Sequence, residues 1–378
     1  MRVIHITPAY KPAYIYGGPT VSISLLCEKL SIRNPNLIVF TTTANGVHDF
    51  HSDENITLVD KVKVIYFKRI LKGRIHLSLS LIKSIYTSTS KEDVYHIHSW
   101  WNATAIISAL SGIVRGNKVI LSPRGMLTPY SIVSSQSLVK RTFQALIGAW
   151  ILKQCFLHVT SEKEKCDVLQ LLNHKKITVI PNLADDRNCK TSQLRNSTPN
   201  TFDILFFSRI DKKKGLEILF AALSQVGFLW NLTIAGSGDD TYVSYLKSEA
   251  EKLKISDRIS WIGFVSIKDK EKIFASHDLL VLFSHNENFA NVIIESLATG
   301  LPVAISNNVG LASFIAEQDL GWVSENELPH IIKALESAFS DIEKRNLINV
   351  NAPAIVKKCF NDEVICDQYL NLYQRNEC

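Results

Sequence analysis

Several features that would place this protein in a specialised class are missing from its 378 residues. No apolar run approaches the roughly 18 residues that a membrane-spanning helix requires. The first apolar run, in MRVIHITPAY, is too short for a signal peptide and predicts a buried strand instead. Low-complexity tracts and short-period repeats are also absent, so a repeat architecture is not expected.

Cysteine is sparse, and its spacing excludes two further classes. The sequence has seven cysteines, an odd number, with no C-x-x-C pair: Cys27, Cys155, Cys166, Cys189, Cys359, Cys366 and Cys378. This spacing argues against a zinc site and against a disulfide framework. Reduced thiols in a cytoplasmic protein are the expectation.

The size and composition are those of a folded protein with two domains. A chain of 378 residues with 46% hydrophobic and 21% charged residues is too long for one ordinary core. Charge is unevenly spread, because residues 1–185 carry 22 Lys/Arg against 11 Asp/Glu, and the remainder carries 20 against 25. A basic front half suits an anionic partner such as phospholipid, a lipid diphosphate or nucleic acid, although a merely solvated surface explains it equally well.

Short apolar runs that are rich in β-formers recur along the chain, separated by longer amphipathic stretches. In the front half they are Val3–Thr7, Leu37–Thr43, Val64–Lys68, Val94–Ser99, Val119–Pro123, Leu157–Ser161 and Thr178–Asn182. In the back half they are Asp203–Ser208, Leu232–Gly236, Ile259–Phe264, Leu279–Ser284, Pro302–Ser306 and Gly321–Ser324. Continuous apolarity predicts strands covered on both faces, and the alternation predicts βαβ units in parallel sheets.

A polar stretch divides these two series of strands. Residues 185–200 lack an apolar period and are rich in loop formers, so we interpret them as a linker. This places one Rossmann-like domain at residues 1–184 and a second at residues 201–360. The apolar spacing within residues 361–378 predicts a terminal helix that packs back on the first domain.

Two carboxylates near one predicted helix give the clearest functional signal. The segment from Ser284 to Glu295 reads SHNENFANVIIE, with Glu287 in a loop after a buried strand and Glu295 in the second turn of the helix that follows. The free N–H groups and partial positive charge of a helix N-terminus suit a diphosphate. A carboxylate beside it can accept hydrogen bonds from sugar or ribose hydroxyls.

Two further segments follow predicted strands. Arg209 and Lys214, in SRIDKKKG after the first back-half strand, could converge on one anion, although solvated surface charges are the more common outcome. Gly17 and Gly18, in the loop after the first strand, would let backbone approach a phosphate, but an ordinary turn explains them as well.

Taken together, these residues resemble the family 4 retaining glycosyltransferases of the GT-B fold, over nearly the whole chain. The resemblance rests on the Gly17-Gly18 loop, the segment from Arg209 to Lys214, and the Glu287 and Glu295 pair, in that order and spacing. Gly236-Ser-Gly238, Trp261-Ile-Gly263-Phe264 and Ile180-Pro-Asn182 also fit. The segment LSPRGMLTPY at residues 121–130 resembles a subgroup of bacterial surface-polysaccharide assembly.

The resemblance implies two Rossmann-like parallel-sheet domains facing a cleft, and sugar transfer from a UDP- or GDP-sugar. Catalytic roles would fall to Glu287, Arg209, Lys214, Arg124 and His98. Donor-binding roles would fall to Gly17, Gly18, Arg209, Lys214, Gly263, Asn288, Phe289, Ala290, Asn291 and Glu295. No metal or cofactor is expected, because no Asp-x-Asp follows a front-half strand and the basic groups can balance the diphosphate; Asp239-Asp240 is interpreted as solvated.

The sequence departs from the family pattern in two places. Ala290 stands where many members have glycine, which tightens the space near the phosphates. Arg124 follows the strand after which many members have histidine, and His98, one strand earlier, is expected nearby; a packed histidine at a strand end is the plain alternative. Which of the two has the role of that histidine stays open.

Other functions on this fold remain open, namely a nucleotide-sugar epimerase and a non-catalytic sugar-nucleotide-binding protein. The acceptor is expected to be a saccharide, free or linked to a polyprenyl diphosphate, and not nucleic acid. Residues 138–156 read as one helix in which Lys140, Arg141 and Lys153 flank an apolar run. Packing on the sheet explains most of that run, but a peripheral contact with the anionic inner face of the plasma membrane is the sharper hypothesis.

Overall fold

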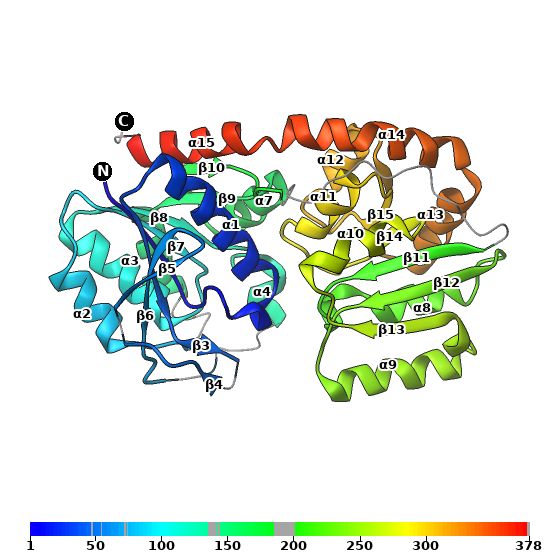
Figure 1. Cartoon of the computed structure of the whole chain (residues 1–378), viewed down its shortest axis with the longest axis horizontal. Helices are drawn as coiled ribbons and strands as arrows, with labels where there is room; N and C mark the ends of the chain where they lie inside the picture. The colour runs from blue at the N-terminus through cyan, green and yellow to red at the C-terminus, as the bar shows by residue number, and fades with distance from the viewer. Residues whose placement is uncertain are drawn as a thin grey trace. The chain divides into compact units, whose positions relative to one another are not determined.

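The computed structural model describes residues 1–375 except 47, 54, 72, 74, 135–141, 143 and 185–200. The chain divides into two compact units (Figure 1). Unit 1 comprises Met1–Leu183 together with Asp362–Cys378, and unit 2 comprises Ala184–Asn361. The expected linker at residues 185–200 lies outside the described residues.

Unit 1 is built on one eight-stranded sheet in the order β10-β9-β8-β7-β1-β2-β6-β5. Its strands are parallel except for β5, which pairs antiparallel with β6 at the edge. They are β1 (Val3–Thr7), β2 (Leu37–Thr42), β5 (Ile56–Val59), β6 (Val62–Phe67), β7 (Val94–His98), β8 (Lys118–Ser122), β9 (Phe156–Val159) and β10 (Ile177–Val179). A separate two-stranded ribbon joins β3 (Ala44–Asn45) to β4 (His48–Asp49).

The helices of unit 1 connect successive strands of this sheet, and the last one returns from the end of the chain. They are η1 (Tyr14–Tyr16), α1 (Gly18–Arg33), α2 (Leu79–Thr87), α3 (Ala103–Arg115), α4 (Pro129–Ser134), η2 (Gln144–Gly148), α6 (Ala149–Gln154), α7 (Glu162–Leu171) and α15 (Asp362–Gln374). Contacts of α15 with α1 place the C-terminal helix in unit 1 (Figure 1).

Unit 2 contains a six-stranded parallel sheet in the order β13-β12-β11-β14-β15-β16. Its strands are β11 (Phe202–Phe207), β12 (Trp230–Ala235), β13 (Ile259–Gly263), β14 (Leu279–Leu282), β15 (Val303–Ser306) and β16 (Gly321–Ser324). Its helices are η3 (Lys212–Lys214), α8 (Leu216–Leu223), α9 (Asp240–Lys252), η4 (Ser256–Arg258), α10 (Ile267–Ala275), α11 (Asn291–Ala298), α12 (Ala312–Glu317), α13 (Leu328–Ser340) and α14 (Ile342–Cys359). This strand order is that of the doubly wound dinucleotide-binding fold.

Both sheets confirm the prediction of two Rossmann-like parallel-sheet domains. Each predicted apolar run overlaps a strand, and the strands near the centre of each sheet are buried, as expected for sheets covered on both faces. The edge strand β5 was not predicted, because its residues Ile56–Val59 are largely exposed and form no continuous buried run.

The helix predicted at residues 138–156 is right only in part. Helical structure among the described residues covers Thr142 and residues 144–154, and the chain then turns extended at Cys155 and enters β9 at Phe156. Lys140 and Arg141 lie outside the described residues.

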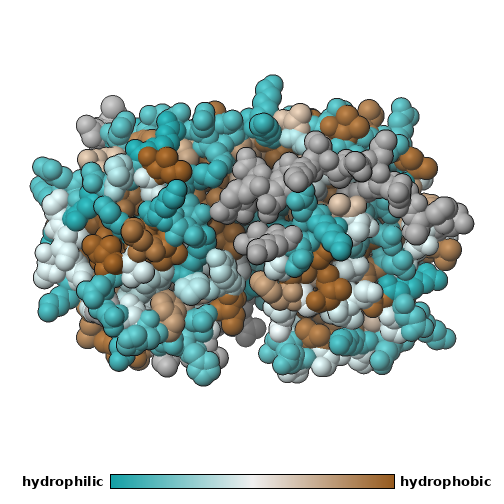
Figure 2. Space-filling model, in the orientation of Figure 1, coloured by the Kyte–Doolittle hydropathy of each residue, from teal (hydrophilic) through white to brown (hydrophobic). Residues whose placement is uncertain are grey.

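Within the described part of the chain, no helix combines the length and apolarity needed to cross a membrane. The face shown in Figure 2 carries hydrophobic residues in several separate groups among hydrophilic ones.

Candidate active site

In unit 2 the two predicted binding segments follow neighbouring strands. Strands β11 and β14 are hydrogen-bonded at the point where the strand order reverses. Open α/β sheets bind their ligands outside the carboxyl ends of such strands. Arg209 and Lys214 come after β11, and Glu287 comes after β14, so the fold brings both segments to this edge.

A glycine sets how closely the two segments approach each other. Gly215 has φ 70°, and a Cβ atom there would lie 2.1 Å from the carbonyl oxygen of Phe283. Only glycine fits such a position. The backbone N–H of His285 also donates to the carbonyl of Lys213 at 2.8 Å. The loop that carries Lys214 is therefore fastened directly to the end of β14.

The first consequence is an ion pair between Lys214 and Glu287. Their side chains are 13% and 19% exposed, so the pair is largely sheltered from water. The backbone of Glu287 is held as well, since its N–H donates to Asn308 and its carbonyl accepts from Gly310. For Lys214, the alternative of a solvated surface charge is therefore wrong, because the fold supplies a carboxylate partner.

Arg209 differs from Lys214 in this respect. Its side chain is exposed, and among the described residues it forms no ion pair. A guanidinium that forms no ion pair can turn toward an incoming anion without first breaking one. The convergence of Arg209 and Lys214 on one diphosphate remains a prediction.

The helix predicted after Glu287 begins at Asn291 and ends at Ala298, with Gly300 at φ 79° just beyond it. Its N-cap is Ala290, in the left-handed conformation at φ 66°, and no side chain caps the helix. The first N–H groups of α11 are thus not used by a capping side chain, as an anion site requires.

Glu295 lies in the second turn of α11, and its partner was not predicted from sequence. Its carboxylate forms an ion pair with Lys270 of α10. The Lys270 ammonium lies 5.1 Å from the ring centroid of Phe207, at the end of β11, and 5.7 Å from that of Phe274. Nothing in the local pattern around Lys270 signals this role, because it depends on the packing of α10 beside α11.

The remaining donor-side residues differ in what they can offer. Phe289 is 3% exposed and packs edge-on against Phe360, so only its backbone can face a ligand. Asn288 and Asn291 are half-buried, whereas Gly263 is exposed at φ 69°. Gly17 and Gly18 stand at the N-terminus of α1 in unit 1, and the N–H of Gly17 already donates to Tyr14. Their grouping with the unit 2 residues remains a prediction.

In unit 1, Arg124 and His98 lie together, as expected. The Arg124 guanidinium donates to Nδ1 of His98 at 3.4 Å and to Oδ1 of Asn182 at 2.6 Å. Arg124 is half-buried with φ 54°, whereas His98 is completely buried. Burial, and then the positive charge of Arg124, hold the pKa of His98 well below its ordinary value. Of the two side chains, Arg124 is therefore the one that solvent can reach.

Two groups of side chains have a spacing that could hold a metal ion within the described residues: buried His5, His96 and His98, and exposed Glu325, Glu327 and His330. The ring nitrogens of the three buried histidines are already hydrogen-bonded to protein groups, which a metal would have to displace. Asp239 caps α9 by accepting from the N–H groups of Thr241 and Tyr242, so its carboxylate has a structural partner.

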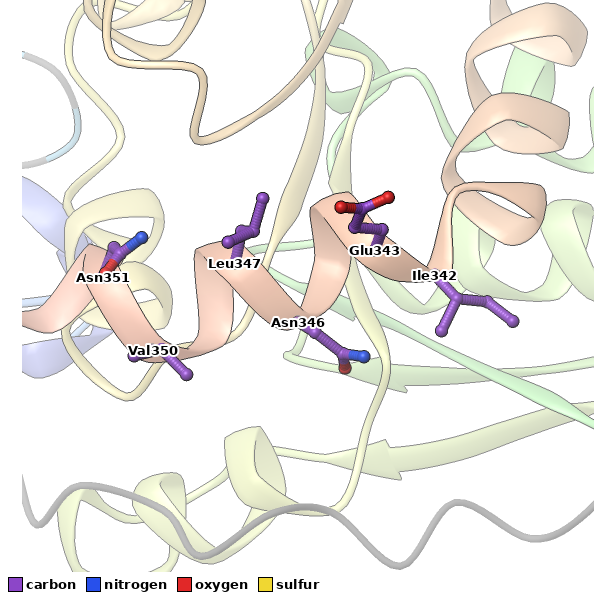
Figure 3. A pocket seen from close by; sticks show the side chains of 6 residues that line it. All are labelled: Ile342, Glu343, Asn346, Leu347, Val350 and Asn351. Atoms are coloured by element: carbon purple, nitrogen blue, oxygen red, sulfur yellow. The ribbon is translucent and has the colours of Figure 1, made fainter.

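A surface depression of about 570 Å³ lies along α14. Figure 3 shows its lining side chains, all of which project from this one helix: Ile342, Glu343, Asn346, Leu347, Val350 and Asn351. None of the predicted site residues contributes to it, and it offers no convergent set of polar groups of the kind that binding sites have.

Known proteins resemble this chain in sequence and in structure. Residues 190–354 match the family described as Glycosyl transferases group 1. The chain is 27% identical to an uncharacterized glycosyltransferase, MJ1607, of Methanocaldococcus jannaschii, over 99% of this chain and 98% of the relative. It is also 27% identical to the lipopolysaccharide core biosynthesis glycosyltransferase LpsE of Rhizobium meliloti, over 45% of this chain and 48% of that protein.

Solved structures resemble the whole chain. The Anabaena protein Alr3699/HepE in complex with UDP has a TM-score of 0.75 at 18% identity, covering 98% of this chain and 99% of that one. The same protein has been solved with UDP-glucose. At this identity the likeness concerns the fold. The chain therefore has the GT-B fold, and its residues 190–354 match the model of the group 1 glycosyl transferases.

Proposed function

We propose that this protein transfers a sugar from a UDP- or GDP-sugar to a saccharide acceptor with retention of anomeric configuration. The observation that carries the proposal is the arrangement at the β11/β14 edge, where Glu287 and Glu295 each have a lysine partner beside the N-terminus of α11. The complexes of HepE with UDP and UDP-glucose support a nucleotide-sugar as the donor.

Each charged group at this edge has a separate role in the proposal. Arg209 and Lys214 stabilise the negative charge that develops on the leaving diphosphate, which is where electrostatic catalysis is most effective. Glu287 accepts hydrogen bonds from the donor sugar and orients its anomeric carbon. Glu295 accepts hydrogen bonds from the nucleotide ribose. In the ligand-free chain, Lys214 pairs with Glu287 and Lys270 pairs with Glu295. Donor binding therefore replaces these ion pairs with contacts to the donor.

The proposal includes no essential divalent cation or other cofactor. In the proposal, Arg209, Lys214 and the N-terminus of α11 balance the diphosphate, and Asp239, which the sequence analysis weighed as a possible metal ligand, caps α9. Turnover that persists in excess EDTA is the expected result, and its loss with recovery on Mg²⁺ or Mn²⁺ would contradict this part.

Unit 1 supplies the acceptor side in this proposal, with Arg124 as the reachable cation. The acceptor is a saccharide of surface-polysaccharide biosynthesis, free or carried on a polyprenyl diphosphate, and nucleic acid has no part in it. The likeness to the lipopolysaccharide enzyme LpsE supports this class of acceptor. So does the resemblance of residues 121–130 to the polysaccharide subgroup. The enzyme would work in the cytoplasm, at the inner face of the plasma membrane.

One structural observation favours a contact with that membrane. On η2 and α6, Leu146 is 72% exposed, Ile147 50% and Trp150 49%, while Ile151 and Leu152 are completely buried. The inward residues account for packing on the sheet, and the outward residues are left as an apolar surface. Lys153 is exposed on the same helix. An apolar face with basic neighbours suits an anionic bilayer surface.

A nucleotide screen tests the proposal directly. The thermal unfolding of the protein is followed with UDP, GDP, ADP and dTDP, and UDP or GDP should stabilise it by about 2.7 kcal/mol at 100 times the dissociation constant. Stabilisation by none of the four would overturn the donor assignment. Turnover of a bound nucleotide-sugar without acceptor to an isomeric nucleotide-sugar would favour an epimerase instead. Tight donor binding with no chemistry toward any saccharide would favour a non-catalytic binding protein.

A further inference from the structure

Four histidines lie together in the core of unit 1. His5 comes from β1, His96 and His98 from β7, and His158 from β9, and all four side chains are completely buried. Tyr369 and Tyr373, one helical turn apart on α15, reach the same cluster. A buried polar group is costly unless it is hydrogen-bonded, so the partners of these rings decide what the cluster is.

The hydrogen bonds form one continuous series from Arg124 to the carbonyl of Ile180, with His98 next to Arg124. His98 Nε2 lies 3.0 Å from His5 Nδ1, and His5 Nε2 lies 3.3 Å from the Tyr373 hydroxyl. That hydroxyl lies 2.9 Å from His96 Nδ1.

The series continues through strand residues to its second end. His96 Nε2 lies 2.7 Å from Ser122 Oγ, which lies 2.6 Å from His158 Nδ1. His158 Nε2 lies 2.9 Å from the carbonyl oxygen of Ile180. Tyr369 touches the same Nε2 at 3.0 Å and is a side branch.

The two ends fix the direction of every bond between them. A guanidinium can only donate and a carbonyl can only accept. From the Ile180 end, His158 must carry its proton on Nε2, so Ser122 donates to its Nδ1 and accepts from His96 Nε2. Since Ser122 accepts from His96 Nε2, that nitrogen carries the proton of His96, and the Tyr373 hydroxyl donates to His96 Nδ1. The Tyr373 hydroxyl in turn accepts from His5 Nε2, which carries the proton of His5.

The Arg124 end gives the same answer independently. Because Arg124 donates to Nδ1 of His98, that nitrogen carries no proton, and the proton of His98 is on Nε2, where it donates to His5 Nδ1. For neutral rings, both ends thus require the same Nε2–H tautomer throughout. An additional proton on His5 or His98 would place one N–H donor against another. An additional proton on His96 or His158 would make the hydroxyl of Tyr373 or Ser122 accept twice and leave its own proton without an acceptor in the series.

We propose that Tyr373, Ser122 and His158 are positioning residues for Arg124. The series to which they belong holds His98 as the neutral Nε2–H tautomer, so that its Nδ1 accepts from the guanidinium. Together with Asn182, this leaves Arg124 held by two neutral acceptors, with no carboxylate paired to it among the described residues. Its positive charge stays available to an anionic substrate group. The role of Arg124 toward substrate rests on the proposed function, whereas the tautomers do not.

The electrostatics of the cluster agree with neutral rings. Burial is the largest cause that lowers the pKa of His5, His96, His98 and His158, and the charge of Arg124 lowers all four further. Burial raises the pKa of the Tyr373 hydroxyl, which keeps it protonated and able to donate to His96.

Nitrogen-15 NMR of histidine-labelled full-length protein tests the proposal without any ligand. Long-range proton–nitrogen spectra distinguish Nε2–H from Nδ1–H and from the imidazolium. Between about pH 6 and pH 8, all four histidines of the wild-type protein should show the Nε2–H pattern only. An Nδ1–H or imidazolium pattern at His5, His96, His98 or His158 would overturn the proposal.

Variants then test whether the tautomer is passed along the series. Arg124→Met alone should keep His98 and His5 in the Nε2–H form, because Tyr373 still anchors them to the Ile180 end. Adding Tyr373→Phe removes that second anchor, and both histidines should become mixtures of the two tautomers. The matched control adds Tyr369→Phe instead, which removes a buried hydroxyl from the same helix without interrupting the series, and should leave one tautomer. A single tautomer in the Arg124→Met/Tyr373→Phe protein, or a mixture in the control, would contradict the role of Tyr373. If the protein proves inactive toward sugars while these spectra are as expected, only the proposed function fails.

Discussion

The ammonium of Lys214 and the carboxylate of Glu287, 73 positions apart in sequence, form an ion pair at the edge where β11 and β14 end. Gly215 makes the approach feasible, since any Cβ there would collide with the backbone that follows β14. Two residues proposed to act on the donor are thus already coupled before it binds.

This pair predicts how substitutions at Lys214 behave. Lys214→Met should lower sugar transfer by about 10²-fold or more, by analogy with removal of one transition-state donor. Part of the loss reflects a half-buried Glu287 left without its partner. Lys212→Met, at an exposed position in the same turn, is the matched control and should be affected far less. Steady-state rates with a nucleotide-sugar donor measure both, and full activity of Lys214→Met would exclude it from the site.

The two carboxylates should separate nucleotide binding from sugar transfer. Glu295→Gln should weaken binding of free UDP or GDP, because its proposed contact is with the ribose. Glu287→Gln should leave free-nucleotide affinity nearly unchanged and reduce turnover, because its proposed contact is with the donor sugar. Calorimetric titration with the nucleotide alone distinguishes them, and equal loss of affinity in both variants would refute this division.

Ala290 should be a stabilising position for glycine. It holds φ 66° as the N-cap of α11, a conformation that is strained for residues with a Cβ. Ala290→Gly should therefore raise the free energy of unfolding by about 1 kcal/mol. Ala316→Gly, at an exposed site in α12, is the matched control and should lower it by roughly 0.5–1 kcal/mol. Urea unfolding curves measure the change in the free energy of unfolding for each variant. A change of the same sign in both variants would show that the strain at Ala290 is relieved in another way.

The buried histidines should make unit 1 labile to acid. Burial, and then Arg124, lower the pKa of His5 and of His158 to about 3 from an ordinary value of 6.5. As the pH falls, these histidines therefore take up protons at a higher pH in the unfolded chain than in the folded one. Stability is complete above about pH 6.5 and falls between that pH and about 3. Each histidine that titrates contributes a slope of up to about 1.4 kcal/mol per pH unit.

Glu164 acts in the opposite sense, because burial raises the pKa of its carboxyl. Unfolding free energies from urea curves at a series of pH values measure the net slope. A stability that does not fall from pH 7 to pH 5 would mean that the buried rings take up protons in the folded state.

The apolar surface of α6 predicts binding to anionic vesicles. Co-sedimentation should rise with the fraction of anionic lipid and fall with added salt. A Leu146→Gln/Trp150→Gln protein should bind less, because it loses exposed side chains without touching the core. Leu347→Gln/Val350→Gln, at equally exposed positions on α14, is the matched control.

The basic residues are tested separately. Lys140→Glu/Arg141→Glu should also weaken binding, although these two positions lie outside the described residues. A wild-type protein that ignores anionic vesicles at low salt would point to a soluble acceptor.

Much of the fold could be predicted from local patterns. Buried parallel strands are apolar along their whole length, so runs such as Leu279–Ser284 coincide with strands in both units. The polar loop at Glu287 likewise marked the start of α11 correctly, because helix ends depend on a few adjacent residues. The exposed edge strand β5 and the end of α6 escaped prediction, since neither follows from apolar periodicity.

The partners of the site residues did not follow from such patterns. Lys270 becomes the partner of Glu295 only because α10 packs beside α11, and Tyr373 reaches His5 and His96 only because α15 returns to unit 1. Periodicity reports which face of an element is buried, and it carries no information about which distant side chain meets that face. Charge state, tautomer and ion pairing depend on contacts within a few ångströms between residues far apart in sequence, and these arise only when the sheets and helices have packed.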